Sequence, residues 1–120
     1  MSLVLTFTLP QIHPEMRSAV IQAIYVHEDA LITRAGKFLD VSVDLSSVAL
    51  HDCPAISFFR IALRDRAYVR SLLIARGDEV AVGTPMARLS TEPDEPLDGV
   101  PNRPARVTIA GILYQPDWWQ

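Results

Sequence analysis

The feature that most constrains the fold is a series of short runs rich in β-branched and aromatic residues, broken by turn-forming residues every eight to twelve positions. Such runs form strands, and regular turns between them are typical of a sandwich or barrel. The run over 18–26 is also compatible with a short helix, but its β-branched and aromatic residues favour a strand. The expected strands cover residues 3–9, 18–26, 38–43, 57–63, 68–74, 79–82, 86–89 and 105–113. The sequence therefore predicts an all-β fold.

The composition narrows the function classes. Hydrophobic residues make up 49% of the 120 residues and charged residues 21%, which is typical of a globular domain. The net charge of −3 gives no general attraction for phosphate backbones, so we expect no nucleic-acid partner. No apolar run reaches the ~20 residues of a membrane span, and the first ten residues lack the features of a signal peptide. With Cys53 as the single cysteine, we expect a cytoplasmic protein without a membrane partner.

Three segments differ in character along the chain. Residues 1–90 hold most of the expected strands and form the predicted domain. Residues 91–104 contain four prolines and four acids, so we expect an extended linker or meandering loop there. Residues 105–120 return to a strand-like run and end in an aromatic tail, which we expect to pack on the domain or on a partner.

An internal repeat relates the two halves of the domain. Shifting the chain by 48 positions places residues 18–41 over residues 66–89 without a gap, and ten of the 24 pairs are apolar in both copies. About six such pairs are expected by chance, so the matching order of strand, turn and strand matters more than the count. The repeat predicts two similar hairpin units, related by a pseudo-two-fold axis, that bury their apolar faces against each other.

The second unit resembles the second half of a lipoyl/biotinyl attachment domain. Residues 77–89 (GDEVAVGTPMARL) show the Gly-Asp turn, the second glycine and the following proline that recur in that family. Leu9-Pro10 is similar to the family's early Leu-Pro, and the resemblance covers roughly residues 3–90. It implies a barrel-sandwich hybrid with an extended C-terminal arm. One departure is that Asp29-Ala30 stands where the first copy needs Gly-Asp, so we expect that turn to differ.

The family carries its cofactor on a lysine in the hairpin after the first half. In the corresponding stretch, residues 42–47, Asp44 matches the family's acid and Leu45 falls on the lysine position. A leucine has no amine to form an amide with lipoate or biotin, so no cofactor is expected. Lys37 is the only lysine of the chain. We expect it in a solvated turn within the first unit, with attachment of biotin or lipoate there as the alternative.

Other residue patterns give no catalytic or metal motif. His51 and Cys53 can share a face of an extended segment, but no second pair of ligands accompanies them. The acidic residues of the linker are expected to be solvated. We therefore expect no metal site and no enzyme activity.

The remaining interpretation is a module for binding another protein. Family resemblance without the lysine suggests an accessory part of a larger enzyme complex, with a swinging-arm carrier for an acyltransferase, 2-oxo acid dehydrogenase or carboxylase as the alternative. Residues 44–54 form the expected tip loop that meets a partner, and the C-terminal tryptophans form a second anchor. Self-association is a further option. The predicted partner-binding residues are Leu45, Val48, Leu50, Trp118 and Trp119.

Overall fold

The computed structural model describes residues 3–33, 36–45, 56–97 and 101–112, and within these ranges every regular element is a strand. The all-β prediction is therefore confirmed at the level of fold class. No helix in the described ranges has the length and apolar character needed to cross a membrane. The strands are β1 (Val4–Thr8), β2 (Ser18–Ile24), β3 (Leu31–Ile32), β4 (Gly36–Asp44), β5 (Ile56–Leu63), β6 (Ala67–Leu72), β7 (Glu79–Ala81), β8 (Pro85–Ser90), β9 (Arg103–Pro104) and β10 (Val107–Ile112).

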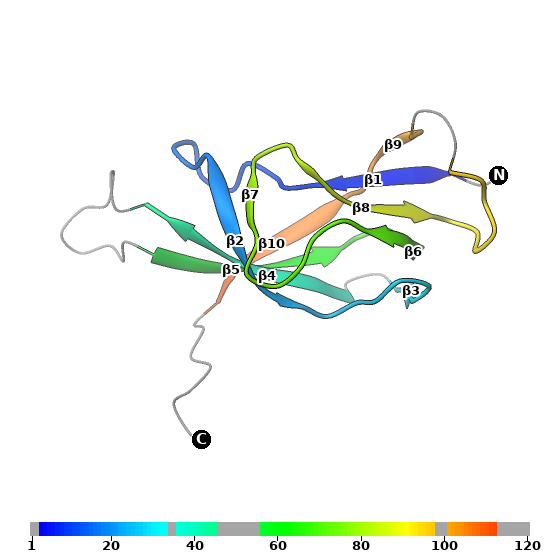
Figure 1. Cartoon of the computed structure of the whole chain (residues 1–120), viewed down its shortest axis with the longest axis horizontal. Helices are drawn as coiled ribbons and strands as arrows, with labels where there is room; N and C mark the ends of the chain where they lie inside the picture. The colour runs from blue at the N-terminus through cyan, green and yellow to red at the C-terminus, as the bar shows by residue number, and fades with distance from the viewer. Residues whose placement is uncertain (1–2, 34–35, 46–55, 98–100, 113–120) are drawn as a thin grey trace, which may run out of the picture.

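The strands form two five-stranded sheets, which we call sheet A and sheet B. Sheet A has the order β3-β6-β8-β1-β9, and sheet B has the order β10-β5-β4-β2-β7. All pairings are antiparallel except that of β1 with β9. Each sheet keeps two edge strands among the described residues, so neither sheet closes on itself. The last residues of β4 and the first residues of β5, which we call the far ends of these strands, lie at one end of the molecule. The end of sheet A where β1 begins lies at the opposite end (Figure 1).

The core forms because alternate residues of the strands turn inward between the sheets. Phe7 of β1 and Phe38 of β4 lie at its centre, with ring centroids 4.5 Å apart in an edge-to-face arrangement. Both side chains are essentially inaccessible to solvent. Aromatic pairs in this geometry contribute roughly 1 kcal/mol beyond the burial of their surface.

A β-bulge changes which residues of β4 face inward. Phe38 and Leu39 are neighbours, yet both are fully buried in the core, because the register of β4 against β5 shifts between Lys37 and Leu39. A second shift, where β2 pairs with β4, lies between Ile21 and Ala23. The bulge in β4 places Asp40 on the outer face of sheet B, where Tyr25 and Arg60 contact it.

We expected the turn at Asp29 to differ from the turn at Gly77, but the two turns have the same backbone features. Asp29 adopts a positive φ of 72°, as Gly77 does at 94°. The backbone N–H of Ala30 donates to His27, and that of Asp78 donates to Ala75, both at 3.1 Å. Aspartate tolerates the left-handed region better than most residues, so the turn forms without glycine.

Candidate functional site

Leu45, at the expected lysine position, follows the last residue of β4 directly. Its side chain is half-buried and packs against the hydrophobic core. A prosthetic group needs an exposed attachment point from which it can reach another protein. An alkyl side chain packed on the core instead contributes to stability, by up to ~2 kcal/mol for full burial.

A groove of about 410 Å³ opens on sheet B beside the far ends of β4 and β5. Within it, Asp44 pairs across the ladder with Ile56, whose side chain is 51% exposed. The hydroxyl of Ser18 donates to a carboxylate oxygen of Glu79 at 2.9 Å, which joins β2 to β7. The groove is lined by Glu15, Arg17, Ser18, Ala19, Val20, Ser42, Asp44, Ile56 and Glu79.

The groove combines charged and apolar side chains. Its charged residues are three acids and one arginine, and its apolar surface comes mainly from Val20 and Ile56. Such a mixture complements a segment that carries both basic and apolar side chains. No group of three or more His, Cys, Asp or Glu side chains that could hold a metal ion occurs in the described part of the chain.

Asp40 is the most deeply buried acid on the outer face of sheet B. Its carboxylate accepts hydrogen bonds from the Nε of Arg60 at 2.9 Å, from the Nη2 of Arg60 at 3.1 Å and from the hydroxyl of Tyr25. Burial and the bond to Asp40 raise the pKa of Tyr25, and the bond to Asp40 raises the pKa of Arg60. The three residues bridge β4, β5 and the end of β2, so their evident role is structural.

Lys37 lies in β4 and not in the turn where the sequence placed it. Its ammonium nitrogen is 4.9 Å from the centroid of the Tyr25 ring, within the range of a cation–π contact. The bulge beside Lys37 lets β4 begin at Gly36, earlier than the sequence pattern predicted. The only lysine is therefore engaged with the Tyr25–Asp40–Arg60 cluster rather than presented at a hairpin tip.

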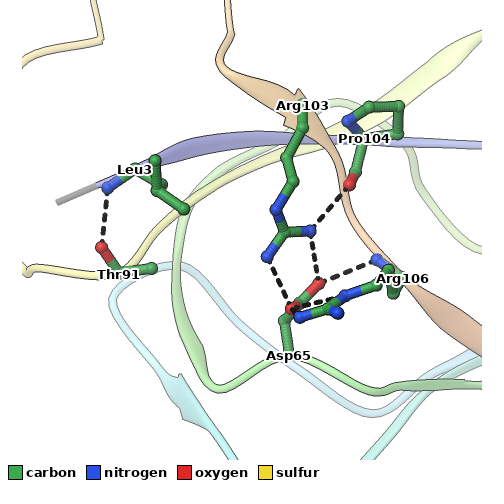
Figure 2. Close-up of polar contacts among 6 residues, drawn as sticks. All are labelled: Leu3, Asp65, Thr91, Arg103, Pro104 and Arg106. Carbon is green, nitrogen blue, oxygen red and sulfur yellow. Dashed lines mark hydrogen bonds and ion pairs between the residues drawn. The ribbon is translucent and has the colours of Figure 1, made fainter. Parts of the chain in front are cut away.

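Asp65 fastens the C-terminal arm, residues 101–112, to the turn between β5 and β6. Figure 2 shows its carboxylate between the guanidinium groups of Arg103 and Arg106, each with an N–O distance of 2.8 Å. The backbone N–H of Arg106 donates to the same carboxylate, also at 2.8 Å. The bond from Arg103 is the main cause that lowers the pKa of Asp65, against the opposing effect of burial.

The segment after β8, residues 91–97, lies on the outer face of sheet A. Arg70 of β6 donates to the carbonyl of Glu95 at 2.6 Å, and Arg88 of β8 donates to the carbonyl of Leu97 at 2.8 Å. The backbone N–H of Leu3 donates to the hydroxyl of Thr91, as Figure 2 shows, and the backbone N–H of Thr91 donates to the carbonyl of Leu3. We call residues 91–97 the strap, because arginines from two strands hold it in place.

Four of the predicted partner-binding residues lie outside the described ranges: Val48, Leu50, Trp118 and Trp119. The predictions for His51 and Cys53 fall outside as well. Leu45 is the only predicted partner-binding residue within the described ranges. It directly follows Asp44, which lines the sheet-B groove.

Sequence reasoning missed the two buried aspartates. Asp40 gave a signal, because it is the one acid within the otherwise apolar and small run of residues 38–43. An acid there requires a paired cation. Asp65 gave none, since its partners Arg103 and Arg106 are about 40 positions away.

The sequence matches no protein-family model, and no curated protein matches it. The resemblance to lipoyl/biotinyl domains therefore rests on the amino-acid sequence of this chain alone.

Proposed function

We propose that this protein is a non-catalytic relative of lipoyl/biotinyl domains that binds another protein, as an accessory part of an enzyme complex. In this proposal the fold is a barrel-sandwich hybrid of two related units, β1–β4 and β5–β8. The surface at the far ends of β4 and β5 contacts the partner where relatives carry a cofactor. The observation that carries the proposal is the core-packed Leu45 at the position of the modified lysine.

The pairing of strands supports the relation between the two units. Within the first unit β2 pairs with β4, and within the second β6 pairs with β8. In this comparison β1, β2, β3 and β4 correspond to β5, β6, β7 and β8. Between the units, the pairing of β1 with β8 corresponds to that of β5 with β4, and the pairing of β2 with β7 corresponds to that of β6 with β3. Exchanging the two units therefore leaves the set of pairings unchanged.

The register of the β2–β4 and β6–β8 ladders also supports the relation between the two units. Val20 pairs with Ser42, and 48 positions later in both strands Tyr68 pairs with Ser90. Both ladders also contain a register shift, after Ile21 and after Val69, again 48 positions apart. A bulge at equivalent places is a specific feature, because bulges redirect the strand and are set by local sequence and packing.

Side-chain contacts on the outer faces follow the same interval. Gln22 donates to the hydroxyl of Ser42 at 2.8 Å, and Arg70 donates to the hydroxyl of Ser90 at 3.1 Å. Such agreement between sequence repeat, register and contacts favours descent of the two units from one hairpin.

The partner surface is proposed at the end of sheet B. Ile56, which is 51% exposed, and Asp44 both line the groove, and they flank in sequence most of the segment expected to meet a partner. Exposed aliphatic side chains flanked by charges are typical of the centre of a protein contact.

Affinity purification from the native host tests the contact. Wild-type protein should retain a specific partner, and Leu50→Asp should lose it at least tenfold while keeping the wild-type unfolding transition. Leu73→Asp serves as the control, because it makes the same substitution at a leucine that is 55% exposed and lies after β6 on another surface. Equal recovery with Leu50→Asp and wild type would exclude the tip loop.

Intact mass tests the carrier alternative. Co-expressed with biotin and lipoate ligases, the wild-type chain should keep its unmodified mass, because Leu45 lacks an amine and Lys37 lies within β4. Leu45→Lys restores an amine at the aligned position, and its mass should increase by one biotinyl or lipoyl group. Modification of wild type at Lys37 would replace the interaction proposal with the carrier function.

A further inference from the structure

The edges of the two sheets differ in how they are protected. Sheet A ends in β3 and β9, each of two residues, and sheet B ends in β7, of three residues, and β10, of six. Short strands, charges and proline are the usual devices that keep an edge from pairing with another chain. Val107–Ile112 has none of them, since it contains no charged residue and no proline. β10 is thus the one long unprotected edge in the described part of the chain.

The backbone groups on the free side of β10 can be assigned from its ladder with β5. The backbone N–H of Arg64 donates to the carbonyl of Arg106 at 2.8 Å, so these two residues form a hydrogen-bonded pair. Bonded and non-bonded pairs alternate along an antiparallel ladder. Val107, Ile109 and Gly111 therefore direct their N–H and C=O groups away from β5.

These three residues form a set that is symmetric about Ile109. If two copies of β10 run antiparallel with Ile109 opposite Ile109, then Val107 lies opposite Gly111 of the other copy. Every outward N–H then meets an outward C=O, which gives six backbone hydrogen bonds. Shifting the register by two residues leaves only two bonded pairs instead of three.

We propose that two copies of this chain associate through β10, joining their sheets B into one continuous ten-stranded sheet. The contact is isologous, so a two-fold axis passes between the two Ile109 residues. It goes beyond the proposed partner contact, because it uses the edge strand and not the end of β4 and β5.

The side chains of β10 fit this arrangement. Ile109 is 39% exposed in the single chain, although it pairs with the fully buried Ile61 on β5. Across the two-fold axis it would gain the side chain of its own counterpart.

Among the described residues nothing packs closely enough to require a glycine at position 111, since a Cβ built there meets no atom within 4 Å and its φ is outside the left-handed region. A glycine inside a strand often marks close approach of another backbone. The neighbouring charges are compatible with the pairing as well. The two Arg106 residues would lie ~20 Å apart at the strand spacing of 3.4 Å per residue, beyond effective repulsion.

Sedimentation velocity of the full chain tests the proposal. Wild type should sediment as a dimer that dissociates on dilution, and Ile109→Lys should raise the dissociation constant at least tenfold, because an inward-pointing charge blocks edge pairing. Leu73→Lys places the same charge at an exposed aliphatic residue outside β10 and should leave the dimer intact. A wild-type chain that stays monomeric at hundreds of micromolar would overturn the proposal, as would a dimer unaffected by Ile109→Lys.

Cross-linking tests the register without relying on disruption. In a Cys53→Ser background, which removes the only cysteine, Ile109→Cys should form a disulfide-linked dimer under mild oxidation. The Cα atoms of a hydrogen-bonded antiparallel pair are about 5.5 Å apart, within the range that a disulfide spans. Leu73→Cys should remain monomeric under the same conditions. Equal cross-linking of both variants would indicate random collision and overturn the pairing.

Discussion

At the scale of single residues, Asp65 does most to hold separate parts of the chain together. Its carboxylate is 5% exposed and accepts bonds from two guanidinium groups and one backbone N–H of the C-terminal arm. Its partners are more accessible, since the side chain of Arg103 is 32% exposed and that of Arg106 is 66% exposed. Loss of the carboxylate therefore leaves cations that water can solvate, which limits the cost of removing it.

Asp65→Asn should lower the free energy of unfolding by about 1.5–3 kcal/mol, the range for hydrogen bonds to charged groups. Urea denaturation at pH 7 measures the difference, with Asp94→Asn, an exposed acid of the strap, as a control that should change little. Equal midpoints for wild type and Asp65→Asn would mean that the arm is held by other contacts.

The pH dependence has a definite sign. The folded protein lowers the pKa of Asp65 below its unfolded value of about 3.9. The stabilisation is therefore fully present above about pH 4 and is lost as the pH falls further, through the folded pKa. The gap between wild type and Asp65→Asn should stay constant from pH 7 to 5 and shrink below pH 4. A gap that widened on acidification would contradict this origin.

At the scale of elements, the sequence predicted the longer strands well because each has its own apolar, β-branched pattern. It missed β3 and β9, since two residues carry no periodic signal and each strand exists only through its partner, β6 or β1. It also missed what holds the strap, because proline-rich, acidic composition predicts a lack of burial and says nothing about arginines on distant strands. Position along the chain cannot reveal bonds between residues that only folding brings together.

Substituting both strap arginines should release residues 91–97. Arg70→Ala with Arg88→Ala removes two bonds from charged donors, each contributing about 1.5–3 kcal/mol. A glutamyl endopeptidase should then cleave after Glu92 or Glu95 at least tenfold faster than in wild type. Arg76→Ala, in the exposed turn before Gly77, is the matched control. Unchanged cleavage rates would show that the ends of the strap suffice to hold it.

At the scale of the whole molecule, the two units interlock and do not form separate layers. Of the six pairings among β1–β8, only β2 with β4 and β6 with β8 lie within a unit. The sheet-B groove shows the consequence, because its lining comes from β2, β4, β5, β7 and the segment before β2. The sequence could place Leu45 at the end of a strand, but it could not predict that Glu79 lies beside Ser18.

The interlocking predicts how the chain behaves when it is divided. Fragments 1–50 and 51–120 each keep a single pair within β1–β8, and an isolated two-stranded pair is marginally stable in water. Each fragment alone should therefore lack a cooperative unfolding transition. Mixed together they should regain the four ladders between the units and form a 1:1 complex. Circular dichroism follows the recovered strand signal, and light scattering gives the stoichiometry. Fragment 51–120 contains six of the ten strands. Cooperative unfolding of this fragment alone would show that one unit is self-sufficient and would contradict the interlocked arrangement.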